Sequence, residues 1–171
     1  MIILRPTQKL HDVLPPTLPV DSESDTALGD WYVNRIVVDR RPLLVLVSVH
    51  ALLPLLIPAR DVRTLPARLS DLVADALRRL NIAPELIEAE ITAMSSVGVA
   101  PTRDRSILGV LNDTAQRVPF YLRHTDWDET TLPFIEARLV QTPWRLPKRS
   151  KDYIFPLDLI PQVLTGRWGA F

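Results

Sequence analysis

Residues 31–57 read WYVNRIVVDRRPLLVLVSVHALLPLLI, and this stretch decides the fold class of the chain. Its first part, residues 31–39, alternates apolar and polar side chains well enough to predict a strand. The Arg-Arg-Pro corner at residues 40–42 turns the chain, and residues 43–49 follow as an almost continuous apolar run. Such a run is typical of a strand that is covered on both faces.

A third strand is expected at residues 51–57, which contain Pro54. Proline is confined to edge strands and bulges because it donates no hydrogen bond to the ladder, so residues 43–49 are expected at the centre of a β-meander. The alternative is a transmembrane helix over residues 42–59, since this run is uncharged and almost long enough to cross a bilayer. We favour two buried strands, because a proline and a histidine interrupt the run and its first half is rich in valine.

After residue 64 the apolar period changes to that of a helix, which is expected to continue to residue 80 and to end at Asn81. Pro84 suits the first turn of the next helix. The remaining expected elements are a strand at residues 1–4, a short helix at 8–14, an extended piece at 95–101, a helix from a Thr102 cap to about residue 118 that Pro119 ends or kinks, a helix at 132–140 and a closing segment at 157–164.

Together these elements predict an α+β fold, in which a small, mostly antiparallel sheet of about three to four strands packs against four to five helices. The chain has 171 residues, the size of one ordinary domain, so residues 1–171 are expected to form a single globular domain. The proline-rich and acidic segment at about residues 15–30 is expected to be a mobile loop.

Composition limits the classes of partner and of chemistry. Twenty basic and twenty acidic side chains cancel, so no overall field attracts nucleic acid or an anionic membrane. The absence of cysteine excludes disulfides, thiolate zinc sites and cysteine nucleophiles, and it fits the reducing cytoplasm. The three histidines are far apart in the sequence and form no metal-binding pair. We expect a soluble cytoplasmic protein with no cofactor and no membrane partner.

The helix expected after Thr102 carries an unusual polar stripe. On an ideal helix Arg105, Gly109, Asn112 and Gln116 fall within about 60° of one another. The apolar side chains of the same helix, Ile107, Leu108, Leu111, Ala115 and Val118, point to the other side. A glycine inside a helix destabilises it by about 1 kcal/mol relative to alanine, so Gly109 needs an explanation.

A polar helical face is commonly just a solvated one, although a solvated face has little use for a glycine. Besides this possibility, two interpretations of the stripe remain open at this point. In the first, a ligand or another backbone approaches at Gly109 between Arg105 and Asn112. The margin of such a site would be formed by Thr102, Ser106 and Asp113. In the second, Gly109 lets a neighbouring strand of the same chain pack closely, and Arg105 and Asn112 satisfy backbone groups in a buried network.

Two further groups of residues are candidate binding sites. The strand of residues 31–39 begins with Trp31, contains Asn34, and leads into Arg40 and Arg41. Two adjacent arginines in a turn can clamp a phosphate or carboxylate. Residues 144–155 interleave basic and aromatic side chains, as in surfaces that hold nucleic acid. In both groups the simpler interpretation is packing of the aromatic side chains with the charges left in water.

Catalytic signatures are absent from the sequence. It contains no G-x-S-x-G elbow, no P-loop and no dinucleotide fingerprint, and its carboxylates show no metal-ligand spacing. Whether the protein is an enzyme is therefore open at this stage.

Three stretches taken together resemble a family of bacterial proteins known only as a domain of unknown function. They are Met1-Ile2-Ile3 with residues 7–10 (TQKL), residues 30–34 (DWYVN) with 39–41 (DRR), and residues 102–113 (TRDRSILGVLND). No activity, cofactor or catalytic residue carries over from this resemblance. It marks as motif positions Lys9, Trp31, Asn34, Arg40, Arg41, Arg105, Gly109, Asn112 and Asp113.

Two hypotheses of function follow. The first is a non-enzymatic binding or regulatory module, whose polar surface around Arg105, Gly109 and Asn112 joins the corner at residues 40–41 and takes a protein partner or a small anionic ligand. The alternative is an enzyme that acts on a phosphate-containing or nucleic-acid substrate. In that hypothesis Lys9, Arg40, Arg41 and Arg105 hold phosphates and Asp113 serves as base or metal ligand, so these segments must converge. A homo-oligomer is compatible with both.

Overall fold

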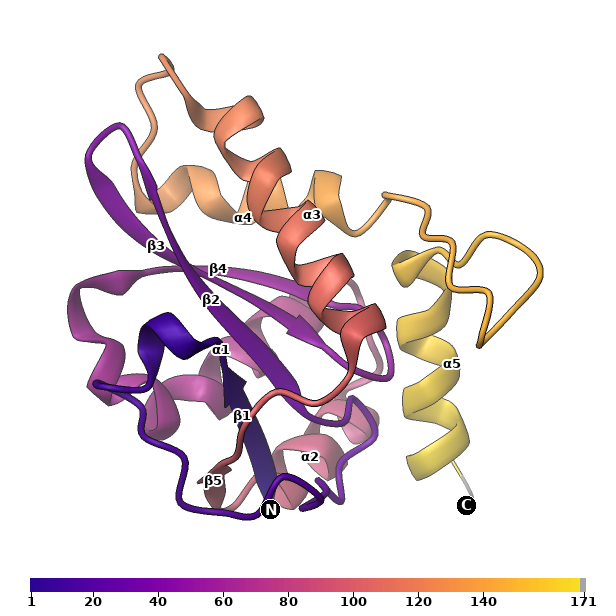
Figure 1. Ribbon diagram of the computed structural model, residues 1–171. Helices are drawn as coiled ribbons and strands as arrows, with labels where there is room; N and C mark the ends of the chain where they lie inside the picture. Colours follow the sequence, from indigo (N-terminus) through magenta and orange to yellow (C-terminus); the bar gives the residue numbers. More distant parts are fainter. Residues whose placement is uncertain (170–171) are drawn as a thin grey trace.

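The computed structural model describes residues 1–169, apart from the side chain of Asp61. Within these residues the chain forms five strands, five α-helices and three short 3₁₀ helices (Figure 1). In chain order they are β1 (Ile2–Pro6), η1 (Gln8–Leu10), β2 (Trp31–Val38), β3 (Arg41–Ser48), β4 (Pro54–Pro58), η2 (Ala59–Thr64), α1 (Leu65–Arg79), α2 (Pro84–Ala93), β5 (Val97–Val99), α3 (Arg105–Leu122), η3 (Glu129–Thr131), α4 (Leu132–Leu139) and α5 (Pro156–Trp168). The predicted α+β class is confirmed.

The five strands form one sheet in the order β4-β3-β2-β1-β5. β2, β3 and β4 are the predicted antiparallel meander with β3 at its centre, whereas β1 pairs in parallel with both β2 and β5. The expectation of a mostly antiparallel sheet of three to four strands is therefore wrong, because the sheet is mixed and has five strands. The strand at β1 is expected from the sequence, but its pairing is not, because parallel partners are joined by long crossovers that the sequence does not reveal. β5 is too short to show a strand period.

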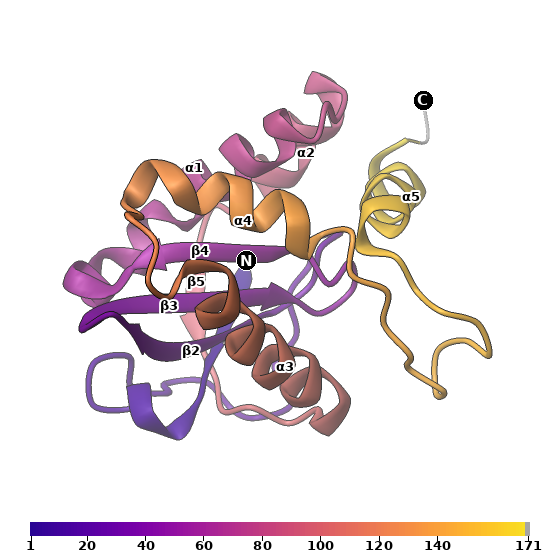
Figure 2. The ribbon, with the colours of Figure 1, turned by 90° about the horizontal axis from the view of Figure 1, so that it is seen from above.

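Helices cover both faces of the sheet, which explains the continuous apolar run in β3. On one face Trp31 and Leu44 pack with α1, α2 and α5, and on the other Tyr32 and Val45 pack with α3 and α4. Figure 2 shows α3 lying along β2 and β3, with α5 at one end of the sheet beside α2. No helix of the described chain is long and apolar enough to span a membrane, and residues 42–59 supply most of β3 and all of β4.

Two expected helices have different bounds in the structure. The helix expected at residues 8–14 is only the 3₁₀ turn η1. α3 begins at Arg105 with Asp104 as its cap, not Thr102, because the Asp104 carboxylate accepts hydrogen bonds from the amides of Ser106 (2.8 Å) and Ile107 (3.3 Å). The same helix continues through Pro119 to Leu122.

The segment before β2 is anchored by a buried arginine. Arg5 on β1 is 0% exposed and forms an ion pair with Asp30. Its guanidinium also donates to the carbonyl oxygens of Val20 (2.9 Å), Ser22 and Pro101 (2.6 Å). These bonds connect the proline-rich segment to the sheet and to the start of α3.

The outer edge of β5 is covered by the same segment. The amides of Thr17 and Leu18 both donate to the Val99 carbonyl oxygen, each at 2.9 Å. A Cβ atom at Gly98 would overlap the end of the Leu18 side chain, so a larger residue here would force Leu18 to shift.

The opposite edge, on β4, offers no free hydrogen-bond donor. Backbone N–H groups point alternately to the two sides of a strand, so the backbone nitrogens of residues 54, 56 and 58 face away from β3. Pro54 and Pro58 have no N–H group, and the Leu56 amide donates to Oε1 of Glu136 on α4 at 2.8 Å. Glu136 also accepts from Nη2 of Arg79 at 2.8 Å. An edge without free donors resists pairing with a second sheet.

The replacement Glu136→Gln is expected to change how stability depends on pH. Burial raises the pKa of the Glu136 carboxyl above its ordinary value of 4.5, although the Leu56 amide and Arg79 act in the opposite direction. The folded protein therefore binds more protons than the unfolded chain, and the free energy of unfolding falls as pH rises from about 4.5 through the folded pKa. The glutamine variant lacks this fall.

Urea unfolding of the wild type and the variant between about pH 4 and pH 8 measures the difference. Glu88→Gln, an exposed position on α2, is the matched control. Parallel stability curves for the wild type and Glu136→Gln would contradict the prediction.

Candidate functional site

The motif positions singled out from the sequence lie at three separate places. Lys9 is exposed on η1 and lines a groove with Arg35 and Arg63. Arg35 alternates in step with Trp31 and so faces the α1 side of the sheet, whereas Asp113 lies on α3 against the other face. The enzyme hypothesis needs Lys9 and Asp113 in one site, and the fold does not bring them together.

Trp31 and Asn34 are structural residues of β2. Trp31 is 0% exposed in the core beneath α1, and its Nε1 has no hydrogen-bond partner among the described residues. The Asn34 side chain is buried, and its Oδ1 accepts from the Thr7 hydroxyl (2.9 Å) and the Arg35 amide (2.8 Å). Asn34 thus holds the turn after β1 against β2.

The double-arginine corner is engaged with another part of the same chain. Asp39 and Arg40 both have positive φ, 50° and 65°, as a two-residue hairpin turn requires. Arg41 stacks on the Trp127 ring at 3.7 Å and donates to the Trp127 carbonyl oxygen. The Trp127 indole in turn donates to Asp39 Oδ2 at 3.1 Å. Arg41 therefore fixes the loop that follows α3, while Arg40 is exposed.

The third group lies together on the outward side of α3. We use the name α3 face for its exposed residues: Arg105, Gly109, Asn112, Asp113, Gln116 and Phe120. None of their side chains makes a hydrogen bond or ion pair with a described residue. With a rise of about 1.5 Å per residue the face extends for about 22 Å along the helix. Arg105 begins α3, whereas the corner at residues 40–41 lies near the C-terminal end of this helix, where Arg41 contacts Trp127. The corner therefore does not join Arg105 and Gly109 in one site.

Rigid packing beneath the helix holds the α3 face in position. Tyr32 is buried, and its hydroxyl oxygen accepts hydrogen bonds from the backbone amides of Arg103 (3.1 Å) and Asp104 (2.8 Å). These bonds hold the start of α3 against the sheet. Further along, Leu111 and Val118 are 0% exposed in the core between α3 and the sheet. The outward residues are therefore presented by an element that is fixed along its length.

Gly109 has open space above it. A Cβ atom built at this position would meet no described atom within 4 Å. Gly109 therefore does not make room for a strand of the described chain, and Arg105 and Asn112 are not part of a buried network. This removes the second of the two interpretations of the stripe.

Phe120 is absent from the stripe expected from the sequence, yet it is the most exposed large apolar side chain of the described chain, at 85%. It stands four residues after Gln116, so it continues the stripe. The helix end expected near Pro119 hides this continuation, because α3 in fact extends past the proline. The Phe120 ring packs edge-on against the Tyr121 ring, with 5.8 Å between the two ring centroids.

The basic and aromatic residues 144–155 lie mainly in a loop that projects between α4 and α5 (Figures 1 and 2). Trp144 anchors the loop, since it is buried and its backbone pairs with that of Ile154. Nη2 of Arg149 donates to the Val49 carbonyl oxygen at 2.6 Å. Burial lowers the pKa of Arg149, and the nearby Asp104 carboxylate partly offsets this.

The α3 face combines several groups that can take part in non-covalent contacts. It presents a guanidinium, two amides, a carboxylate and an aromatic ring, which bind through hydrogen bonds, ion pairs and contact area. Among the described side chains, which do not include that of Asp61, no three from histidine, aspartate or glutamate gather closely enough to hold a metal ion.

The fold and the α3 face define an α+β domain with a mixed sheet and an open polar helix across it. Over residues 3–159 the sequence matches DUF6933, a domain of unknown function, and the chain belongs to this family. The matched range contains almost the whole sheet and all of α3. Comparisons with curated proteins and with solved structures gave no match.

Proposed function

We propose that this protein is a non-enzymatic cytoplasmic binding module that recognises a protein partner through the α3 face. The observation that carries the proposal is the glycine at the centre of this face. Gly109 destabilises its helix by about 1 kcal/mol relative to alanine, and no described atom needs the space that its missing side chain leaves. Gly166 on α5 shares both features, so what distinguishes Gly109 is its position among polar side chains that have no partner in the described chain. A requirement outside the chain accounts for this combination.

An open face favours a protein partner over a small ligand. Sites for small molecules are concave and enclose most of the ligand, but no described atom stands within 4 Å of a Cβ at Gly109. A partner helix or strand that lies across α3 brings its backbone close at the glycine. Arg105 then meets an acidic group, Asn112 and Gln116 meet polar backbone, and Phe120 buries its ring in the contact.

The replacement Gly109→Ala is expected to stabilise the isolated protein by about 0.5–1 kcal/mol, because alanine has the better helix propensity and meets no steric obstacle. Thermal unfolding should show a rise of about 1–4 °C. Gly166→Ala on α5 is the control, since a Cβ atom at Gly166 would also meet no described atom within 4 Å. A loss of stability in Gly109→Ala would show that the glycine serves the fold.

The larger replacement Gly109→Trp tests recognition itself. Purified wild type, Gly109→Trp and Gly166→Trp are used as bait in an extract of the host cell, and captured proteins are compared. A partner retained by the wild type and by Gly166→Trp but lost with Gly109→Trp supports the proposal. Equal capture by all three proteins contradicts it. Arg105→Ala/Asn112→Ala should unfold at the wild-type temperature and capture less of that partner.

A further inference from the structure

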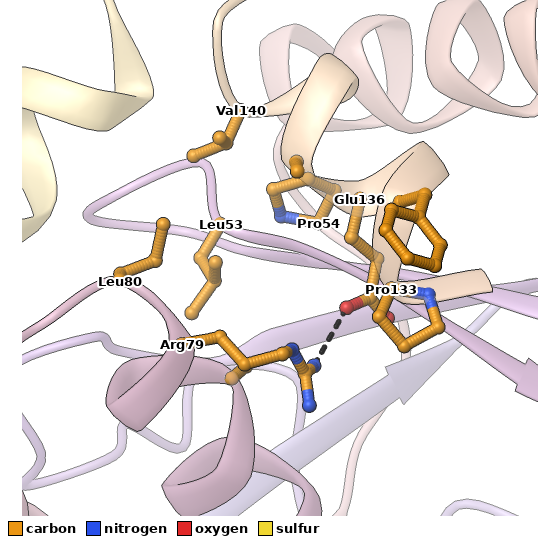
Figure 3. Close-up of a pocket in the computed structure, with 10 residues that line it drawn as sticks. Leu53, Pro54, Arg79, Leu80, Pro133, Glu136 and Val140 are labelled. Atoms are coloured by element: carbon orange, nitrogen blue, oxygen red, sulfur yellow. Dashed lines mark hydrogen bonds and ion pairs between the residues drawn. The ribbon is translucent and has the colours of Figure 1, made fainter. Parts of the chain in front are cut away.

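A cavity opens at the β4 edge of the sheet, apart from the α3 face. Its volume is about 280 Å³, and its walls come from the start of β4, the end of α1 and the length of α4 (Figure 3). Figure 3 shows Leu53, Leu80 and Val140 at one end and the pair Arg79–Glu136 at the other. The cavity therefore has an apolar end and a charged end.

The absence of free backbone donors on the β4 edge allows the cavity to be apolar. Pro54 lines it and has no N–H group, and the Leu56 amide is already bonded to Glu136. No β4 amide in the described chain therefore requires a water molecule there, and an apolar group can occupy the space without leaving a donor unpaired.

The charged end has unused donors and no unused anion. Oε1 of Glu136 accepts from the Leu56 amide and Oε2 accepts from Nη2 of Arg79, both at 2.8 Å. Arg79 has five N–H groups, and its Nε and Nη1 have no partner among the described residues. The Arg79 side chain is 44% exposed, so water satisfies these N–H groups in the free protein. A ligand that displaces this water has to bring an acceptor, and an anionic acceptor forms the strongest hydrogen bond.

We propose that this cavity binds a small organic carboxylate, with its apolar body against Leu53, Leu80 and Val140 and its carboxylate on Arg79. The volume sets the size of the body. An engineered cavity of about 150 Å³ holds benzene, so the cavity of about 280 Å³ accommodates one aromatic ring with a short chain. Phe134 lines the cavity and is 72% exposed, so a bound ligand also covers an otherwise exposed ring.

A ligand carboxylate bound to Arg79 lies beside the carboxyl group of Glu136, which already pairs with the same guanidinium. Two carboxylates on one guanidinium repel each other, and a proton on one of them relieves the repulsion. Burial already raises the pKa of Glu136, which makes it the group that takes this proton.

The test uses three probes with the same body: 3-phenylpropionate, 3-phenylpropanamide and 3-phenylpropylamine. Titration of each into the full-length protein is followed by backbone amide shifts in NMR spectra. We expect saturable shifts around Ala76, Leu80 and Ala137, and an affinity for the carboxylate at least about tenfold above that for the amine. Arg79→Gln should lower carboxylate affinity about tenfold and leave amide binding unchanged.

A second variant keeps the test decisive if Arg79→Gln fails to fold. Ala137 is exposed and lines the cavity, so Ala137→Leu fills it without disturbing the core and should abolish binding of all three probes. Ala67→Leu, exposed on α1 away from the cavity, is the control that should bind as the wild type does. Shifts elsewhere, equal binding of amine and carboxylate, binding that survives Ala137→Leu, or self-association through this edge in sedimentation would each overturn the proposal.

Discussion

Arg5→Met is expected to remove about 3–5 kcal/mol from the free energy of unfolding, because it breaks a buried ion pair from one side. The buried Asp30 carboxylate would lose its close cation and keep only the more distant Arg103, whose Nη2 lies 3.9 Å from Oδ2. Three carbonyl oxygens, those of Val20, Ser22 and Pro101, would also lose their donor. Native domains are stable by only about 5–15 kcal/mol, so this loss is a large part of the total.

Thermal and urea unfolding measure the effect, which at this chain length corresponds to a fall of about 6–20 °C. Arg78→Met is the matched control, because Arg78 is exposed and its one ion pair among the described residues is with Asp75, one turn earlier on α1. Such surface pairs contribute about 1 kcal/mol or less. If Arg5→Met and Arg78→Met unfold at the same temperature, the buried arginine does not anchor the segment before β2.

A loss of similar size is expected for Glu90→Ala. Glu90 on α2 is 0% exposed, and its carboxylate accepts from the amides of Ala27 (2.8 Å) and Leu28 (3.0 Å) and from the Trp168 indole (2.7 Å). Alanine would leave these three donors without their acceptor, and hydrogen bonds to charged groups are worth about 1.5–3 kcal/mol each. We expect a destabilisation of about 3–5 kcal/mol.

The Glu90 replacement should also release α5, since Trp168 lies at the end of that helix. Hydrogen exchange of the α5 amides therefore has to accelerate more than exchange in β3. Glu88→Ala, exposed on the same helix, should leave both stability and exchange close to those of the wild type. Wild-type exchange rates in α5 of a folded Glu90→Ala protein would show that the carboxylate does not hold this helix.

The elements that could be predicted are those whose own side chains show a period. The meander of β2, β3 and β4 followed from an alternating segment, a continuous apolar run and Pro54 at an edge. α1 followed from its apolar face, and Asn81 ends it with a positive φ of 58°. β5 has only three residues and one is glycine, so its pairing depends on β1, which is distant in the sequence.

The candidate site was predictable in part for the same reason. The α3 face lies on one helix, so the period of about 3.6 residues was enough to group Arg105, Gly109 and Asn112. The grouping failed where it joined separate segments, because the fold places Lys9 on the other face of the sheet from α3 and Arg41 on Trp127. The cavity at the β4 edge had no sequence signal, since its Arg79–Glu136 pair spans 57 residues.

The sequence by itself determined the α+β class, the three-stranded meander and the polar stripe, because each depends on periods within one segment. Only the tertiary structure decided that the sheet is mixed, that Arg5 and Glu90 are buried and bonded, and that Gly109 faces open space. The physical reason is distance along the chain. The hydrogen-bond partners of Arg5 lie 15 to 96 residues away and those of Glu90 62 to 78 residues away, so neither local propensity nor periodicity contains them.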